Sequence, residues 1–183
     1  MGHRLDAWRP DQNYKQGYSA NSAHGGGALF DLIRQIDIAL WLFGPATEVD
    51  AVLAKLGKLN IQGDDVTNLL LTHNHGFTGH IQLDIASHVH RCEAEIKTTD
   101  ELFRWSNAEG MLRKLTPDNE IIINCLPKGI KRNDLFHSHM EHGLQRIDNP
   151  KLSPLCSFED GVTALRVAIC ARHASSFKHM VKL

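Results

Sequence analysis

Residues 24–44 read HGGGALFDLIRQIDIALWLFG, and this stretch says more about the fold than any other part of the chain. Apolar side chains recur at helical spacing, at positions 29, 32, 33, 36, 40 and 43. Three glycines precede the pattern, and Gly44 and Pro45 follow it. The spacing therefore predicts one amphipathic helix that ends at Gly44.

Downstream of this helix, short segments rich in β-branched residues alternate with turn signals such as Gly63-Asp64. The expected strands cover residues 48–56, 66–73, 78–91, 92–98, 102–106, 111–115 and 120–125. Two closing helices are expected at 133–147 and 159–176, the second capped by Ser157 with Asp160 in the capping-box position. This order predicts an α+β fold: an open, mostly antiparallel β-sheet with helices packed on one face.

Composition excludes several classes of protein. The 183 residues carry 20 Lys+Arg against 21 Asp+Glu, a balance that argues against a nucleic-acid or anionic-membrane surface as the main partner. No apolar run is long enough to span a bilayer, and no signal peptide is visible. The four cysteines are widely spaced and form no CxxC pair, which favours free thiols and a cytoplasmic location.

Histidines are frequent, and residues 71–80 read LTHNHGFTGH. We interpret this stretch as a hairpin: His73 ends one strand, His75 lies in the turn, and His80 opens the next strand. In the expected strand 78–91 the polar side chains share one face: His80, Gln82, Asp84, His88 and His90. A zinc-binding, histidine-rich protein is the alternative, but no established ligand spacing is present, so we predict no metal site.

Residues that suit ligand chemistry gather at the glycines. Gly26 and Gly27 would let a ligand approach backbone N–H groups at the positive end of the helix. Asp31 and Arg34, three residues apart, would share a helix face. The pair fits either a simple ion pair or a functional site, and spacing alone leaves both open.

The same stretch resembles the C-terminal domain of the glucose–fructose oxidoreductase / inositol dehydrogenase (Gfo/Idh/MocA) family. That family carries a pattern close to GGGxLxD, then a histidine, then an aspartate, and then WLFG; this chain has GGGALFD at 25–31, Asp37, and WLFG at 41–44. WRPDQNYKQGYSA at 8–20 resembles the arm before the glycines. RND at 132–134 and FEDG at 158–161 resemble the closing elements, so the likeness covers nearly the whole chain.

The resemblance implies a two-part parent protein. In the family an N-terminal Rossmann domain binds NAD or NADP and supplies a lysine, and the C-terminal domain completes the substrate site. No GxGxxG occurs in this chain. We therefore expect residues 1–24 to be an arm or linker, and residues 25–183 to be the substrate-binding and oligomerisation domain. NAD or NADP is expected in the full-length parent, and none is expected bound to this chain.

Site residues follow from the same resemblance. Asp31 matches the family's catalytic aspartate, whereas the family's histidine falls on Arg34, which stays charged and is a poor general base. Gln35 follows it and is expected to bind the substrate, while Gly26 and Gly27 are expected to contact the cofactor. In the arm, Trp8, Arg9 and Tyr14 are expected either to line the substrate pocket or to pack the arm onto the domain.

The implied activity of the parent is hydride transfer to or from a secondary alcohol of a sugar or sugar derivative. The resemblance also implies a homodimer or tetramer assembled through the open sheet face, where His80, Gln82, Asp84 and His88 would meet a second copy. Because Arg34 replaces a histidine, the alternative is a non-catalytic ligand-binding or assembly module with the same fold.

Overall fold

The computed structural model describes residues 1–8, 10–126 and 129–183. The chain divides into two compact units. Unit 1 comprises Met1–Arg91 and Phe158–Leu183, and unit 2 comprises Cys92–Ser157. Each unit has its own antiparallel four-stranded sheet, and the two are described separately below.

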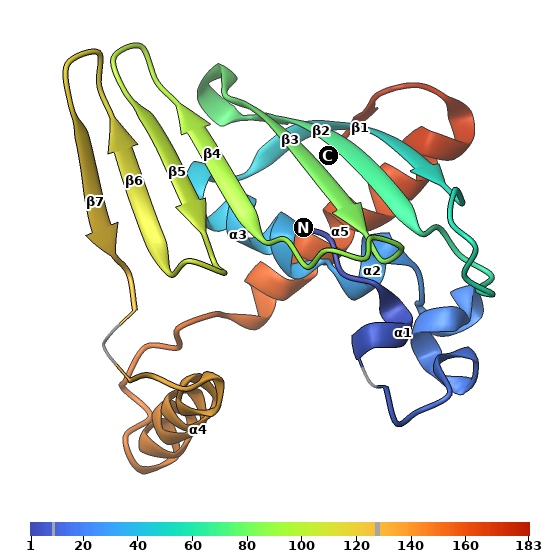
Figure 1. Ribbon diagram of the computed structural model, residues 1–183, viewed down its shortest axis with the longest axis horizontal. Helices are drawn as coiled ribbons and strands as arrows, with labels where there is room; N and C mark the ends of the chain where they lie inside the picture. The colour runs from blue at the N-terminus through green and yellow to red at the C-terminus, as the bar shows by residue number, and fades with distance from the viewer. Residues whose placement is uncertain (9, 127–128) are drawn as a thin grey trace. The chain divides into compact units, whose positions relative to one another are not determined.

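The sheet of unit 1 has the strand order β3-β2-β1-β8 (Figure 1). Its strands are β1 (Ala46–Ala54), β2 (Val66–His73), β3 (Thr78–Asp84) and the short β8 (Val181–Lys182). The 3₁₀ turn η4 (Asn74–Gly76) joins β2 to β3, so the predicted hairpin is confirmed. The sequence analysis missed β8, which adds the last residues of the chain to the edge of β1.

One face of this sheet is apolar and buried. The register aligns the alternating core residues of neighbouring strands, so that Val49 lies opposite Leu71 and Ala51 opposite Leu69. The largest fully buried apolar side chains on these strands are Val49, Leu69, Leu71 and Leu83.

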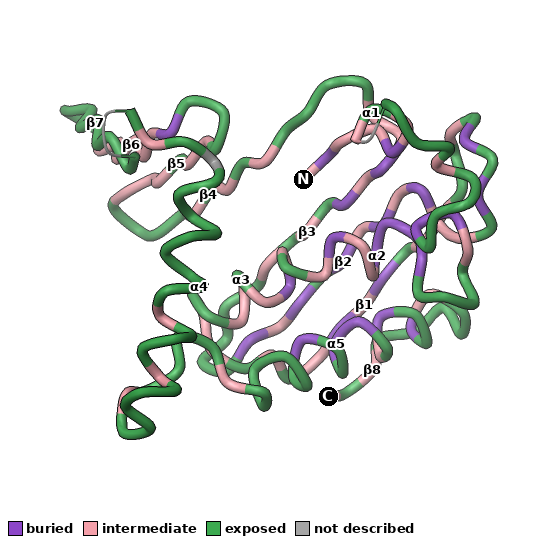
Figure 2. The backbone as a smooth tube through the Cα atoms, turned by 90° about the horizontal axis from the view of Figure 1, so that it is seen from below, coloured by how far each residue is buried: buried purple, intermediate pink, exposed green. Residues whose placement is uncertain are grey.

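Three helices of unit 1 also contribute to the core: α2 (Ala28–Asp31), α3 (Arg34–Phe43) and α5 (Phe158–Phe177). Figure 2 shows buried residues running along these helices and the adjacent strands. The face of α5 that enters the core consists mainly of alanines, so the helix can approach β1 closely, and the Ser175 hydroxyl accepts a hydrogen bond from the Leu53 N–H (2.9 Å).

The first residues of the chain belong to the core of unit 1. The Gly2 N–H donates to the Arg91 carbonyl (2.8 Å), and the Leu5 N–H donates to the Ile85 carbonyl (2.8 Å). Leu5 begins the single-turn helix α1 (Leu5–Trp8) and is buried. Three 3₁₀ turns then lead to the glycines: η1 (Tyr14–Gln16), η2 (Tyr18–Ala20) and η3 (Ser22–His24).

Unit 2 contains the second sheet and one long helix. Its strands pair in chain order: β4 (Glu93–Lys97), β5 (Leu102–Ser106), β6 (Met111–Leu115) and β7 (Glu120–Asn124). The helix α4 (Arg132–Asp148) begins where Asp134 accepts a hydrogen bond from the Lys131 N–H (2.8 Å). The α+β class is thus confirmed, although the strands form two sheets rather than one.

Two predicted elements need correction. The helix expected through residues 29–43 is broken, because Leu32 leaves the helical region (φ −107°, ψ 20°) between α2 and α3. The strand expected at 78–91 ends at Asp84, whose carboxylate accepts the N–H groups of Ala86 (3.0 Å) and Ser87 (2.5 Å) and so turns the chain. His88 and His90 therefore lie outside the strand, and of the five residues expected on its polar face only His80, Gln82 and Asp84 belong to β3.

Candidate functional site

Asp31 is the last residue of α2 and lies at the break before α3. Both of its carboxylate oxygens are buried, and neither has a hydrogen-bond partner among the described residues. A buried carboxylate normally acquires partners, because an unpaired one costs free energy. The structure therefore holds a reactive group in an unfavourable state at the position where the sequence predicts the site.

The surroundings of Asp31 favour its protonated form. Burial raises the pKa of Asp31, and the negative charge of Asp64 acts in the same direction. The side chains of Ser19 and Tyr18 and the charge of Arg34 lower the pKa again, but only in part. Ser19 and Tyr18 lie close enough for this effect, although neither forms a hydrogen bond of normal geometry with the carboxylate. A raised carboxyl pKa is typical of groups that exchange protons in active sites.

We expect Asp31→Asn to raise the thermal midpoint of the chain at pH 7. The wild type loses stability as the pH rises through the raised pKa of Asp31, because the charge that forms is buried. Below the ordinary aspartate value of 3.8 the carboxyl is neutral in both states, so the difference from the variant should shrink there. Midpoints measured from pH 3 to pH 8 check this, with Asp37→Asn on α3 as the matched control. A difference that does not change with pH would contradict it.

The glycine block packs tightly against its own surroundings. The N–H of Gly26 donates to the Asn21 carbonyl (3.0 Å), and a Cβ atom at Gly26 would lie 2.3 Å from the Tyr18 carbonyl oxygen. Gly27 has φ 116°, and a Cβ atom there would lie 2.5 Å from Asp64 Oδ1. Only glycine fits either place without moving the backbone.

Asp64, from the segment before β2, lies against the first residues of α2. Its carbonyl accepts the Ala28 N–H (2.9 Å), and its Oδ2 accepts the Leu29 N–H (2.9 Å) and the Thr67 hydroxyl (2.6 Å). The N–H groups of Ala28 and Leu29 thus already donate hydrogen bonds to Asp64. The negative charge of the Asp64 carboxylate also disfavours a second anion at this position. The residues present therefore do not fit the diphosphate of a dinucleotide, and cofactor contact at Gly26 and Gly27 stays a prediction that this geometry does not favour.

Arg34 begins α3 and is exposed. Its Nη1 donates to the backbone carbonyl of Asp31 (3.4 Å), and no ion pair joins the two side chains. The simple ion pair that the spacing allowed is therefore not formed. The exposed guanidinium remains near the break and can meet a ligand, while Gln35 follows it on the same helix.

The arm residues fall into different environments. Trp8 packs against the core, and its Nε1 is buried without a hydrogen-bond partner among the described residues. Tyr14 also packs against the core, and its hydroxyl accepts the Asn60 N–H (3.2 Å). Arg9 lies outside the described residues. The contacts of Trp8 and Tyr14 agree with packing of the arm, and their role in substrate binding stays a prediction.

Sequence reasoning missed Tyr18 and Ser19, the arm residues that lie beside Asp31. They belong to η2, whose carbonyls lie against Gly26. Tyr18 is exposed, whereas Ser19 is buried. Tyr18 and Ser19 lie beside Asp31 because η2 packs closely against Gly26. In the sequence, only the three glycines indicate that such close packing is possible.

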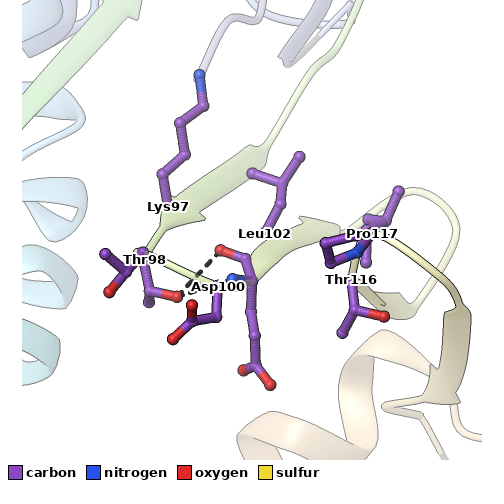
Figure 3. A pocket seen from close by; sticks show the side chains of 9 residues that line it. Lys97, Thr98, Asp100, Leu102, Thr116 and Pro117 are labelled. Carbon is purple, nitrogen blue, oxygen red and sulfur yellow. Dashed lines mark hydrogen bonds between the residues drawn. The ribbon is translucent and has the colours of Figure 1, made fainter.

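A second surface feature lies in unit 2 (Figure 3). It is a depression of about 340 Å³ between the β4–β5 and β6–β7 turns, with Thr98, Asp100, Leu102 and Thr116 in its lining. In each turn a threonine hydroxyl accepts the N–H three residues on, as Thr98 does from Glu101 (3.0 Å). These side chains close the turns, and none of them belongs to the Asp31 site. Across the described ranges, no group of three metal-ligating side chains converges.

Comparison with solved structures shows where this fold occurs. An oxidoreductase from Agrobacterium radiobacter, solved with NAD+, L-tartaric acid and magnesium, is 20% identical with a TM-score of 0.77 over 99% of this chain. Aldose-aldose oxidoreductase from Caulobacter crescentus with glycerol is 19% identical (TM-score 0.79, 100% covered). A levoglucosan dehydrogenase with NADH and levoglucosan is 18% identical (TM-score 0.80, 100% covered).

At these identities the likeness shows the fold alone. The chain spans 53–56% of the length of these three structures. No curated protein matches it. A family model for the GFO/IDH/MocA C-terminal domain matches residues 2–104, which is more than half of the sequence. The chain therefore belongs to the Gfo/Idh/MocA family, as a C-terminal domain.

Proposed function

We propose that this chain is the substrate-binding and oligomerisation domain of an NAD(P)-dependent oxidoreductase. The proposed reaction transfers hydride to or from a secondary alcohol of a sugar or sugar derivative. One observation carries the proposal: the Asp31 carboxylate is buried and has no hydrogen-bond partner among the described residues. The resemblance aligns Asp31 with the family's catalytic aspartate. The sugar-like ligands named for the solved relatives support the substrate class.

Two residues of this chain have distinct proposed roles. Asp31, whose raised pKa favours the protonated form, holds or accepts a proton at the reacting hydroxyl or at a group that relays it. Arg34 orients an oxygen-rich substrate through hydrogen bonds and steadies negative charge on its oxygen. A nicotinamide supplies the hydride chemistry when it is bound, and Trp8, Arg9, Tyr14 and Gln35 are proposed to line the substrate side.

The domain boundaries remain proposals. We propose that residues 1–24 are an arm from a nucleotide-binding domain in the parent, and that residues 25–183 form the C-terminal domain. The engaged N–H groups at the start of α2 support placement of the cofactor diphosphate outside this chain. This chain covers only 55% and 56% of the length of two of the solved structures, which supports a longer parent protein.

Assembly and location complete the proposal. We propose a homodimer or tetramer in which sheets of this domain meet, as the family resemblance implies. A cytoplasmic location is proposed on the four cysteines, none of which forms a disulfide in the described part of the chain. Among the described helices, none is both long and apolar enough to cross a bilayer.

The test uses the proposed parent protein, in which this chain is joined to a nucleotide-binding domain. We expect NAD(P)-dependent turnover with a member of a panel of sugars, polyols and sugar acids. Asp31→Asn should lower kcat about a hundredfold, because it removes the proposed proton-transfer group. The matched control is Asp37→Asn, six residues further on. Wild-type kcat in Asp31→Asn, or no turnover with the whole panel, would contradict the proposal.

A non-catalytic binding module is the second candidate. Arg34 favours it, since a permanently charged, exposed side chain stands where the family carries a histidine. A parent that binds a sugar with unchanged affinity in Asp31→Asn, but never reduces or oxidises nicotinamide, would support this second reading.

A further inference from the structure

Strand β7 is an unprotected edge of the unit 2 sheet. It is the outermost strand in the order β4-β5-β6-β7 (Figure 1), and among the described residues no strand pairs with its other side. Its sequence is EIIIN, and all five residues are exposed. Ile121, Ile122 and Ile123 are 45%, 51% and 47% exposed. A β-branched edge strand of this kind readily pairs with another chain.

The opposite edge of the same sheet is protected. Strand β4 carries Glu93, Glu95 and Lys97 on one face, and both Lys97 (3.1 Å) and Arg104 (2.8 Å) form ion pairs with Glu95. Charged side chains along an edge discourage another strand from pairing there. In β7 the only charge is Glu120, and Arg113 on β6 pairs with it (3.2 Å). The β7 edge is therefore open to pairing with another strand, whereas the charged β4 edge disfavours it.

The register shows which backbone groups of β7 are available. The Cys125 N–H donates to the Gly110 carbonyl (2.8 Å), in step with the β6–β7 register. Because backbone groups alternate in direction along an antiparallel strand, Ile121 and Ile123 also point theirs toward β6. The N–H and C=O of Ile122 therefore point outward, together with those of Glu120 and Asn124.

We propose that β7 pairs with β7 of a second copy, antiparallel, with a two-fold axis at Ile122. In this register Ile122 exchanges both backbone hydrogen bonds with its own counterpart, and Ile121 lies opposite the second copy's Ile123. Glu120 faces Asn124 rather than another glutamate, so the strand is complementary to itself in charge. The pairing joins the two four-stranded sheets into one.

Such pairing also extends an apolar surface. Along the register, Phe103 and Trp105 on β5 share a face with Ile121 and Ile123 on β7, with Leu112 and Lys114 of β6 between them. Pairing at the edge places the isoleucines of the two copies side by side on that face. The β7–β7 pairing would be one contact of the assembly proposed above, and it rests on that proposal only in requiring a second copy.

The test is sedimentation analysis of the 183-residue chain over a concentration series. We expect a monomer–dimer equilibrium in the wild type. Ile122→Pro removes the outward N–H without removing a hydrogen bond to β6, and it should raise the dimer Kd at least about tenfold. Ile122→Thr keeps the N–H and the β-branched side chain, and its Kd should stay within about threefold of the wild type.

Amide exchange on the wild type gives a second readout that needs no variant to fold. Protection of the Ile122 amide should rise with protein concentration, while Ile121 and Ile123, which already bond to β6, change little. A monomer at every concentration up to about 200 µM overturns the pairing, because any remaining dimer would then have a Kd weaker than that. An unchanged Kd in Ile122→Pro overturns the edge contact and leaves assembly through a sheet face. Neither readout involves turnover, so failure of the proposed activity would be seen separately.

Discussion

Gly26→Ala is expected to lower the free energy of unfolding of unit 1 by about 3 kcal/mol, the upper range for forced overpacking. A Cβ atom at this position would lie 2.3 Å from the Tyr18 carbonyl oxygen and 2.5 Å from that of Ser19. Both neighbours are backbone atoms, so no side-chain rotation relieves the clash. The turn η2 must move away from the glycines, and with it the two residues beside Asp31.

Native-state amide exchange of Leu69 and Leu71 measures this loss, because both lie in the buried centre of the unit 1 sheet. The matched control is Gly143→Ala on α4, where a Cβ atom would meet nothing within 4 Å. There the same change should stabilise the helix by about 0.5–1 kcal/mol, because alanine loses less conformational entropy than glycine. Equal effects at the two glycines would mean that the close approach at Gly26 is not what requires a glycine.

Asp65→Ala is expected to cost unit 1 about 4 kcal/mol, since two charge-assisted hydrogen bonds are lost and a buried side chain is removed. Asp65 is 0% exposed. Its Oδ1 accepts the Leu56 N–H (2.7 Å), and its Oδ2 accepts the Gly57 N–H (2.7 Å). The carboxylate thus holds the turn that follows β1, and the Asp65 N–H bonds back to the Ala54 carbonyl (3.0 Å).

The same amide-exchange measurement reports on Asp65→Ala. Asp65→Asn should lie between wild type and alanine, because its amide keeps one acceptor for the two N–H groups. Asp11→Ala, at an exposed position in the arm, should change the free energy of unfolding by less than about 0.5 kcal/mol. If Asp65→Ala were as mild as Asp11→Ala, the turn would not depend on the carboxylate.

Asp64 and Asp65 show which structural roles a local sequence pattern can predict and which it cannot. The sequence marks Gly63-Asp64 as a turn, and the chain bends at Gly63 before β2 begins. It does not show that Asp64 caps α2, 35 residues earlier in the chain, or that Asp65 closes the loop after β1. The hydrogen bonds of Asp64 and Asp65 come from backbone N–H groups, which almost every residue provides. No pattern of side chains in the sequence therefore predicts them.

By itself, the sequence determined the elements whose signals are local. Alternation and turn residues placed β5 and β6 to the residue, and placed α4 and α5 to within one residue at each end. The family followed from the glycine block and was confirmed over residues 2–104. These features could be predicted because each depends on neighbours a few positions away in the chain.

Tertiary structure alone decided the rest. No glycine or proline marks the break at Leu32, which occurs where α2 and α3 both pack into the core. The break places Asp31 beside Ser19 and buries its carboxylate, and the same packing leaves Arg34 exposed without an ion pair to Asp31. Burial and electrostatic surroundings arise from residues that are distant in sequence. The sequence therefore identifies Asp31 and Arg34 as candidate site residues, but the tertiary structure determines their burial, their partners and their charge state.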